Sequence, residues 1–484
     1  MKTKTNLLFI LTDDQGYWAM GCAGNAEIRT PNLDRLAATG IHFANFFCAS
    51  PVCSAARASI LTGRIPSQHG VQDFLRAGNS SILGNGDQGI EYLAGQTAYT
   101  NLLAEAGYLC GLSGKWHLGF SEKPQKGFAY WDVHATGSGP YYNAPMIRDG
   151  QLYQRSDYVS DLITDSALNF LESQKENEQP FCLNVNYTAP HAPWGREHHP
   201  AELYDDYFQN CTFDSVPDEP MHPLHLHKEG AAGSLGFTEE SRRAALSGYF
   251  AATTAMDMNV GRLLGWLEEN NLRENTLIIF TSDNGMNMGH HGIYGKGNGT
   301  FPPNMFDTSV KVPVLISHPG HVPQDAVTDS LHSHYDLMPT LLDYFGIANP
   351  NAEDLPGRSF APLLRGNQMA EQEQVVVFDE YGPTRMIRTR EWKYVHRYPF
   401  GPHELYDLNN DPGERENLIG ESAQQELREG LQAELEGWFV RYADPMRDGS
   451  REAVMGRGQL DVVGPEALGK KRFADDVAYH ADYL

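Results

Sequence analysis

The stretch Asn6-Leu7-Leu8-Phe9-Ile10-Leu11, followed directly by Thr12-Asp13-Asp14-Gln15-Gly16, indicates the fold of this chain. Its apolar residues are continuous rather than alternating, which is typical of a parallel strand covered on both faces. Further runs of this kind are Tyr108–Leu112, Phe181–Asn186, Thr276–Phe280 and Val312–Ser317. Helix-like segments between the runs are Asn32–Ala38, Thr97–Glu105, Tyr158–Gln174 and Thr238–Leu272. The alternation predicts an α/β fold with a large, mostly parallel sheet sandwiched by helices.

The last part of the chain has a different pattern. Short strand-like segments are Gln374–Tyr381, Thr384–Thr389 and Lys393–Arg397, and a helix is expected at about Ser422–Tyr442. This pattern predicts a smaller C-terminal α+β subdomain that carries a short antiparallel sheet. We place the boundary after Pro362, with a catalytic domain over residues 1–362 and the subdomain over residues 363–484.

The amino-acid composition and net charge limit the kinds of molecule that this protein is expected to bind. The chain has 484 residues, 41% of them hydrophobic, and 37 Lys and Arg against 62 Asp and Glu, so its net charge is −25. A charge this negative disfavours general binding to nucleic acids or anionic membranes, and an anionic substrate would need a locally basic pocket. No apolar run approaches the ~20 residues of a membrane span, and Asp13 and Asp14 interrupt the first run too early for a signal peptide. We therefore expect a cytoplasmic protein, or a periplasmic or secreted one if a leader was removed.

Polar clusters follow most of the predicted strands. Besides the first cluster, they are Gly114-Lys115-Trp116-His117, Thr188-Ala189-Pro190-His191 and Thr281-Ser282-Asp283-Asn284-Gly285. The carboxyl ends of parallel strands meet at one edge of a sheet, where ligands bind. Clusters that are far apart in the sequence are therefore expected to form one site.

Asp13, Asp14, Asp283 and Asn284 would bring only oxygen ligands to that site. Oxygen ligands suit Ca²⁺ or Mg²⁺ rather than zinc, and carboxylates packed together without a cation would repel. Alternatively, each pair only caps a turn, which is a common use of Asp and of Asn-Gly. Because both pairs directly follow a strand, we favour the metal site.

Cys53 lies in the stretch Pro51-Val52-Cys53-Ser54-Ala55-Ala56-Arg57, at the expected start of a helix. Backbone N–H groups and the helix dipole favour an anion at this position, and Arg57 lies one turn further on the same face. The residues alone allow a thiolate nucleophile here. They equally allow a small buried cysteine.

Together with Leu61-Thr62-Gly63-Arg64, this cysteine stretch resembles the signature of the type I sulfatases, formylglycine-dependent members of the alkaline-phosphatase-like superfamily. Seven further motifs match in order: Asp13-Asp14-Gln15-Gly16, Thr30-Pro31-Asn32-Leu33-Asp34, Gly114-Lys115-Trp116-His117-Leu118-Gly119, Pro190-His191-Ala192-Pro193, Ser282-Asp283-Asn284-Gly285, Gly295-Lys296-Gly297 and Glu404-Leu405-Tyr406-Asp407-Leu408. The commonest form of the signature has Pro where this chain has Ala55. The Ala form resembles substrates of the anaerobic radical-type maturation enzyme and is compatible with a bacterial protein.

The resemblance implies that a formylglycine-generating maturation enzyme oxidises Cys53 to formylglycine, whose hydrate attacks sulfur. It also implies one Ca²⁺, preferred to Mg²⁺, held by the modified residue and by four oxygen ligands: Asp13, Asp14, Asp283 and Asn284. Asp283 would accept the proton of the attacking hydroxyl. The implied substrate is small and sulfated, a sulfated mono- or oligosaccharide by family habit.

Further roles follow from the same resemblance. His191 would protonate the leaving alcohol, and His117 would act as the base that releases sulfate. Lys115 and Lys296 would grip the sulfate oxygens, and Arg57 would orient the nucleophile. His291, which approaches Lys296 along a glycine-rich loop, is predicted to contact substrate. Without the resemblance, Lys115 reads as a solvated lysine, His117 as a core histidine and His191 as part of a turn.

Two other functions compete with a sulfatase. The first is a phosphodiester or phosphonate monoester hydrolase on the same fold, in which a His commonly stands where this chain has Asn284. The second is a binding protein for sulfated glycans in which Cys53 is never oxidised. The asparagine favours the sulfatase over the first alternative.

Overall fold

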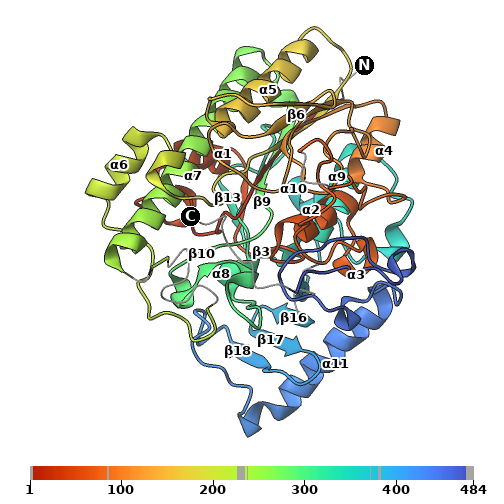
Figure 1. Cartoon of the computed structure of the whole chain (residues 1–484). Helices are drawn as coiled ribbons and strands as arrows, with labels where there is room; N and C mark the ends of the chain where they lie inside the picture. The colour runs from red at the N-terminus through yellow and green to blue at the C-terminus, as the bar shows by residue number, and fades with distance from the viewer. Residues whose placement is uncertain are drawn as a thin grey trace.

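The computed structural model describes residues 4–83, 87–225, 235–236, 238–370, 372–379 and 383–475. Figure 1 shows a large α/β part, with a small sheet and one long helix packed at its lower side. This is the predicted arrangement of a large sheet between helices with an α+β unit at the C-terminal end. Within the described residues, no helix combines the length and the apolar character that a membrane crossing requires.

The large sheet has ten strands in the order β13-β2-β12-β9-β1-β8-β4-β5-β6-β7. Its five central neighbours, from β9 to β5, pair in parallel. The strands are β1 (Asn6–Thr12), β2 (Ile41–Phe43), β4 (Leu109–Lys115), β5 (Tyr130–His134), β6 (Met146–Arg148), β7 (Gln151–Tyr153), β8 (Phe181–Asn186), β9 (Thr276–Ser282), β12 (Val314–Ser317) and β13 (Ala326–Thr328).

One predicted parallel strand is wrong in direction. The run Val312–Ser317 forms β12, but β12 pairs antiparallel with both β9 and β2. All four of its residues are buried. A strand covered on both faces is continuously apolar whichever way it runs, so the pattern reports burial and not direction.

Helices cover both faces of the sheet (Figure 1). The five predicted helices agree with α1, α4, α5, α7 and α11 to within three residues at each end. The helices are α1 (Pro31–Ala38), α2 (Cys53–Thr62), α3 (Pro66–His69), α4 (Tyr99–Glu105), α5 (Val159–Gln174), α6 (Ala201–Asn210), α7 (Glu239–Glu269), α8 (Asp307–Val310), α9 (Leu337–Phe345), α10 (Ala361–Leu364) and α11 (Gln425–Tyr442).

Strand β1 joins two hydrophobic cores, because successive side chains of a strand point to opposite faces. Leu7, Phe9 and Leu11 pack into the core that includes α2, α4 and α9. Leu8 and Ile10 pack into the core that includes α5 and α7. Burial of each such side chain contributes roughly 1.5–3 kcal/mol, so the strand that leads to Asp13 and Asp14 is held from both sides.

The C-terminal sheet is antiparallel, in the order β15-β16-β17-β18. Its strands are β15 (Gln374–Asp379), β16 (Thr384–Thr389), β17 (Trp392–Arg397) and β18 (Glu404–Asp407). The end of the predicted strand Gln374–Tyr381 lies outside the described residues. The sequence pattern missed β18 as a strand. Two small sheets pair β3 (Phe46–Phe47) with β14 (His332–Ser333) and β10 (Asn287–Met288) with β11 (Tyr294–Gly295).

Candidate active site

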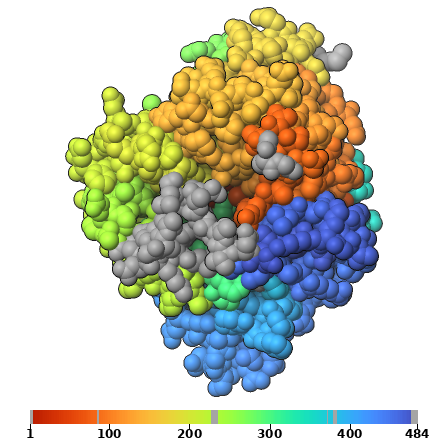
Figure 2. Space-filling view, in the orientation of Figure 1, coloured from red at the N-terminus to blue at the C-terminus, as the bar shows by residue number. Residues whose placement is uncertain are grey.

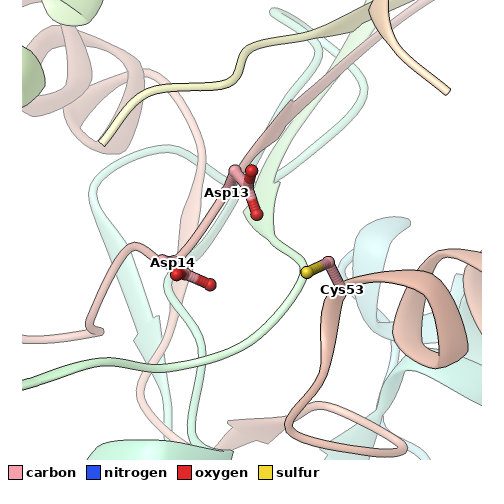
Figure 3. A group of neighbouring side chains, drawn as sticks. All are labelled: Asp13, Asp14 and Cys53. Atoms are coloured by element: carbon pink, nitrogen blue, oxygen red, sulfur yellow. The ribbon is translucent and has the colours of Figure 1, made fainter. Parts of the chain in front are cut away.

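The predicted oxygen ligands and Cys53 meet at the carboxyl edge of the sheet. Figure 3 shows Asp13 and Asp14, at the end of β1, facing Cys53 on the first turn of α2. One ligand atom from each of these three residues lies within 4.8 Å of the others, and all three side chains are buried. Segments forty residues apart therefore form one cluster.

Pairing of β1 with β9 places the second pair of ligands beside the first. Thr12 is in register with Ser282, and the Asp283 N–H donates to the Thr12 carbonyl at 3.1 Å. The Asp14 N–H in turn donates to Asp283 Oδ1 at 3.2 Å, and Asn284 Nδ2 donates to Asp14 Oδ1 at 2.8 Å. All four ligand residues are fully buried.

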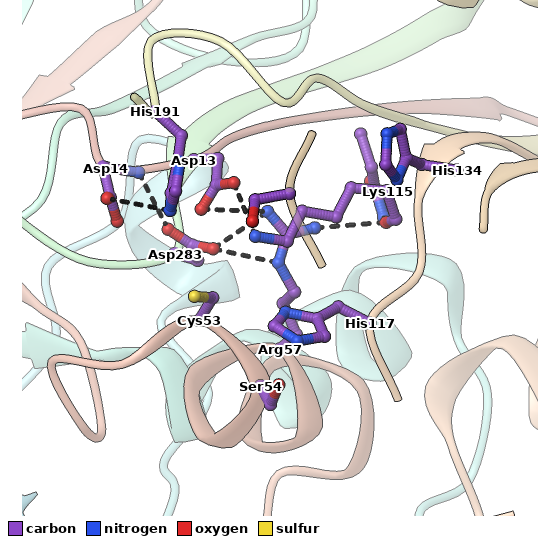
Figure 4. Close-up of polar contacts among 12 residues, drawn as sticks. Asp13, Asp14, Cys53, Ser54, Arg57, Lys115, His117, His134, His191 and Asp283 are labelled. Carbon is purple, nitrogen blue, oxygen red and sulfur yellow. Dashed lines mark hydrogen bonds and ion pairs between the residues drawn. The ribbon is translucent and has the colours of Figure 1, made fainter. Parts of the chain in front are cut away.

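Two lysines bring positive charge to the carboxylates (Figure 4 shows Lys115). Lys115 is the last residue of β4, and its Nζ lies 2.5 Å from Asp13 Oδ2. Lys296 reaches in from a loop, with its Nζ 2.5 Å from Asp14 Oδ1 and 3.3 Å from Cys53 Sγ. Both lysine side chains are buried. The two ammonium groups therefore offset negative charge of the carboxylates at this site, in a protein with a net charge of −25.

Arg57 supplies the third cation, one helical turn after Cys53 as expected. Its Nε donates to Asp283 Oδ2 at 2.9 Å, and its guanidinium also contacts the Lys115 carbonyl at 3.2 Å. The side chain is only 2% exposed. Two guanidinium nitrogens of the buried arginine lie 2.9 Å from the same oxygen, Asp283 Oδ2, so Arg57 holds Asp283 in place beside Cys53.

Several oxygens of the ligand set are buried and have no hydrogen-bond donor among the described residues. They are Asp13 Oδ1, Asp14 Oδ2 and Asn284 Oδ1. Burial of an acceptor without a partner is costly, so an arrangement of three such oxygens calls for a ligand. A hard divalent cation that takes oxygen ligands fits this donor set.

The three carboxyl groups titrate differently, although all are buried. Burial raises the pKa of Asp13 to about 6, against the opposing charge of Lys115. Burial would raise the pKa of Asp14 as well, but Lys296 and His191 bring it below its usual range. For Asp283, the charges of Arg57, Lys115 and Lys296 overcome burial and hold the pKa well below its usual range. Asp14 and Asp283 are therefore ionised at neutral pH.

Cys53 itself is a poor nucleophile as a thiol. It starts α2, where the expected helix dipole and N–H groups are present. Even so, burial raises the pKa of the Cys53 thiol, and the two lysines only partly oppose this. A thiolate would therefore be scarce near neutral pH, which argues against the simple cysteine nucleophile that the residues alone allowed.

His117 lies below the guanidinium of Arg57 in Figure 4. Its Nε2 lies 3.1 Å from the Leu75 carbonyl, while its buried Nδ1 has no hydrogen-bond partner among the described residues. Burial, together with the charges of Lys115 and Arg57, holds the pKa of His117 well below its usual range. The ring is therefore neutral.

His191 stands on the opposite side of the cluster (Figure 4). Its Nε2 lies 3.6 Å from Asp14 Oδ2, and its Nδ1 lies 2.7 Å from the Ala192 carbonyl. The Tyr141 hydroxyl donates to the backbone carbonyl of His191 at 2.6 Å. The imidazole is thus held at two points, with Nε2 directed at the ligand cluster.

Ten of the eleven residues predicted for the site come together here. The exception is His291. Its ring stacks on Phe306, with 3.7 Å between centroids and 8° between planes. Phe306 belongs to a small apolar cluster with Tyr406 and Leu408, so His291 packs toward the C-terminal sheet.

Two site residues were missed by the sequence analysis. His134 ends β5 in register with Lys115, and its buried Nε2 has no hydrogen-bond partner among the described residues. Asn186 ends β8 and donates to the Lys115 carbonyl at 2.9 Å. Both are terminal residues of strands in the parallel sheet. Attention to strand ends, rather than to the loops after them, could have found them.

Comparison with known proteins agrees with this geometry. The family model described as Sulfatase matches residues 5–347, and one described as N-sulphoglucosamine sulphohydrolase, C-terminal, matches residues 289–440. The N-acetylglucosamine-6-O-sulfatase of Bacteroides thetaiotaomicron is 29% identical over 95% of this chain and 90% of its own length.

Solved structures show the same fold. A structure described as a complex with its substrate D-glucosamine-2-N,6-O-disulfate superposes with a TM-score of 0.77, at 26% identity, over 93% of this chain and 100% of the other. The phosphonate monoester hydrolase of Agrobacterium radiobacter has a TM-score of 0.68 at 22% identity, over 90% of this chain and 96% of its own. The second likeness concerns the fold alone. The Sulfatase model covers most of the chain, and the chain therefore belongs to the sulfatase family, as a sulfuric-ester hydrolase with the alkaline-phosphatase-like fold.

Proposed function

We propose that this sulfatase hydrolyses a sulfate ester of a carbohydrate, using a formylglycine made from Cys53 and a bound Ca²⁺. The observation that carries the proposal is the position of residue 53. It starts a buried helix, faces buried oxygens that lack donors, and lies 3.3 Å from the ammonium group of Lys296. An anion bound between residue 53 and the lysines would meet positive charge on several sides.

Four residues of this chain would hold the metal: Asp13, Asp14, Asp283 and Asn284. Their oxygens suit Ca²⁺, which accepts more ligands and a looser geometry than Mg²⁺. When bound, the cation would polarise a sulfate oxygen and stabilise the charge that develops on it. The ionised state of Asp14 and Asp283 keeps two negative ligands available at neutral pH.

Formylglycine would supply what the thiol lacks, a hydroxyl nucleophile that needs no ionised sulfur. Asp283 is proposed to accept a proton from that hydroxyl, and Arg57 holds its carboxylate in place. Lys115 and Lys296 are proposed to bind sulfate oxygens, because both ammonium groups lie at the ligand carboxylates and that of Lys296 lies 3.3 Å from Sγ of residue 53. The supply of Cys53 aldehyde requires a maturation enzyme as a partner.

The two histidines suit opposite proton transfers. His191 directs Nε2 into the cluster, 3.6 Å from Asp14 Oδ2, and is proposed to give a proton to the leaving alcohol. His117 is neutral and presents an unpaired Nδ1, as a base for the release of sulfate requires. The acid and the base thus lie on different sides of residue 53 (Figure 4).

The substrate class rests on the relatives. The bacterial relative named above is an N-acetylglucosamine-6-O-sulfatase, and the superposed structure was described with a glucosamine disulfate. We therefore choose 6-O-sulfated N-acetylglucosamine as the first substrate to test. A phosphonate or phosphodiester activity has no supporting observation in the ligand set, since Asn284 offers an amide oxygen where that alternative commonly has His.

The test uses protein from a host with a formylglycine-generating enzyme, after mass spectrometry shows an aldehyde at residue 53. We expect release of sulfate from 6-O-sulfated N-acetylglucosamine, and a loss of at least roughly 1,000-fold in Cys53→Ala with unchanged thermal stability. Matched sulfate and phosphonate esters of one alcohol serve as the control. Faster turnover of the phosphonate ester, or full activity in Cys53→Ala, would overturn the proposal.

A further inference from the structure

The backbone of Leu75 contacts both the residue after Cys53 and the proposed base His117. Its N–H donates to Ser54 Oγ at 3.0 Å, in the residue that follows Cys53. Its carbonyl lies 3.1 Å from His117 Nε2. A shift of Leu75 would therefore move the start of α2 and the imidazole together.

The Leu75 carbonyl also sets the tautomer of His117. A carbonyl oxygen only accepts hydrogen bonds, so Nε2 must carry the hydrogen when the neutral ring makes this contact. Nδ1 then holds the lone pair, and Nδ1 is the buried nitrogen that has no hydrogen-bond partner among the described residues. The contact thus leaves the basic nitrogen free to receive a proton.

Leu75 is itself held by a residue nearly four hundred positions away. Leu75 forms a parallel β-bridge with Gln459, which is fully buried. The Gln459 N–H donates to the Phe74 carbonyl at 2.8 Å, and its carbonyl accepts from the Arg76 N–H at 3.0 Å. These two bonds fix the peptide on either side of Leu75.

The side chain of Gln459 fastens the same segment a second time. Its Oε1 accepts from the Gln72 N–H at 2.8 Å, and its Nε2 donates to the Gly70 carbonyl at 3.0 Å. Nε2 also donates to the Asp461 carbonyl at 2.9 Å, which fixes the turn of the tail. The amide of Gln459 therefore bonds both the Gln72 N–H and the Gly70 carbonyl, two backbone groups of a loop that has no regular secondary structure.

Other bonds of the tail reinforce this contact. The Gly458 N–H donates to Asp73 Oδ2 at 2.9 Å, and Gln72 Nε2 donates to the Arg447 carbonyl at 2.5 Å. In Figure 2 the dark blue surface of the tail lies directly against the orange surface of the N-terminal part. The loop after α3, from Gly70 to Arg76, is thus held by the tail along its length.

We propose that Gln459 is a positioning residue for His117, and that the C-terminal tail completes the active site by fixing Leu75. The proposal rests on the proposed function, in which His117 is the base for sulfate release. The printed hydrogen bonds of the Gln459 side chain go to Gly70, Gln72 and Asp461, not to residue 53 or the ligand carboxylates. Loss of this side chain would leave the backbone bridge in place but release Gly70 and Gln72, loosen the loop that carries Leu75, and let the His117 ring change its tautomer or rotate.

The test compares Gln459→Ala with the isosteric Gln459→Glu and with Leu468→Ala, an exposed residue of the same tail. All three are assayed as matured full-length enzyme. We expect kcat to fall about 10- to 100-fold in Gln459→Ala, with KM changed less than about 3-fold, because a misplaced group costs turnover more than binding. Gln459→Glu keeps the acceptor for Gln72 and should fall between Gln459→Ala and the wild type. Leu468→Ala should match the wild type.

An activity-independent readout separates this proposal from the proposed function. In protein labelled with ¹⁵N-histidine, the signals of His117 are assigned by their loss in His117→Gln. We expect the Nε2–H tautomer in the wild type and a mixture in Gln459→Ala. If the tautomer and kcat of the folded variant equal those of the wild type, Gln459 is only structural and the proposal is wrong. If the tautomer changes but the wild type releases no sulfate, the proposed function fails instead.

Discussion

Among the described residues, two buried clusters each contain both carboxylates and cations. They differ in how completely the charged groups pair with one another. The site cluster consists of Asp13, Asp14 and Asp283 with Arg57, Lys115 and Lys296. The second, the anchor cluster, consists of Asp307, Arg388, Lys393 and Glu414, and joins α8 to the C-terminal sheet. Both exclude water, so each charge needs a partner.

In the anchor cluster the charges are paired within the protein. Lys393 Nζ lies 2.6 Å from Asp307 Oδ1, contacts Glu414 and donates to the Met305 carbonyl at 2.9 Å. Glu414 also accepts from the Asp307 N–H at 2.6 Å. Asp307 and Glu414 thus each have Lys393 at ion-pair distance, although Asp307 Oδ1, Glu414 Oε1 and Arg388 Nε make no hydrogen bond among the described residues. The cluster is expected to contribute to the packing of the two parts.

In the site cluster, by contrast, one oxygen of each first-strand carboxylate stays apart from the cations. The ion-pair partner of Asp14 Oδ2 is His191 at 3.6 Å, and that of Asp13 Oδ1 is Arg57 at 3.9 Å. The comparison teaches that incomplete pairing, rather than burial or charge, distinguishes a binding cluster from a structural one. A cluster whose charges are all paired within the protein stabilises the fold, whereas a cluster with unpaired carboxylate oxygens can still bind a cation.

The largest expected effect comes from breaking the open cluster. Asp14→Asn removes a negative ligand, and we expect activity to fall at least roughly 100-fold because the metal is lost or misplaced. Ca²⁺ should raise the melting temperature of the wild type and fail to raise that of the variant. Melting curves with Ca²⁺ and with a chelator measure this.

Asp307→Asn is the matched control in the closed cluster. It should lower the free energy of unfolding by up to about 3–5 kcal/mol, because the buried Lys393 loses one of its two carboxylate partners and Arg388 loses its ion pair with Asp307. Its response to Ca²⁺ should remain that of the wild type. A Ca²⁺ response that survives in Asp14→Asn would show that the open cluster is not the metal site.

A smaller effect is expected from the titration of Glu414. Burial raises the pKa of Glu414 to about 7 from its usual 4.5, although Lys393 opposes this. A group whose pKa is raised in the folded state contributes stability below its unfolded pKa and loses it as the pH rises. The free energy of unfolding should therefore fall by on the order of 3 kcal/mol between pH 4.5 and about 7 on account of this residue.

Urea unfolding of the wild type and of Glu414→Gln across that window isolates the contribution. The difference between the two free energies should change with pH, since the amide does not titrate. A difference that stays constant would mean that Glu414 is ionised throughout and that the anchor cluster is held by charge alone. That result would make the two clusters more alike than the geometry indicates.

The smallest effect is expected at His291, whose ring stacks on Phe306 and lies near Lys393 and Asp307 of the anchor cluster. Removal of the stacked ring in His291→Ala should lower stability by about 0.5–1.5 kcal/mol. kcat/KM should change less than about 2-fold, because the ring packs on Phe306. A large rise in KM with unchanged stability would restore the predicted substrate contact.

The sequence predicted which polar residues lie together better than it predicted the direction of one strand and the contacts of one loop. Asp13, Asp283 and Lys115 could be placed together because each marks the end of an apolar run, and parallel strands end at one edge. His291 could not be separated from them, since a glycine-rich loop that includes Lys296 does not reveal which of its side chains turn inward. The direction of β12 was equally hidden, because burial on both faces gives one pattern for either direction.

The sequence by itself determined the α/β class, and it named the residues that we propose carry the chemistry and the order in which they occur, since these depend on local patterns and residue types. Only the tertiary structure decided which charges remain unpaired and which carbonyl holds His117. Those features depend on contacts such as that between Leu75 and Gln459, whose partners are almost the whole chain apart. Neither residue carries a local signal of the other, so packing alone brings them together.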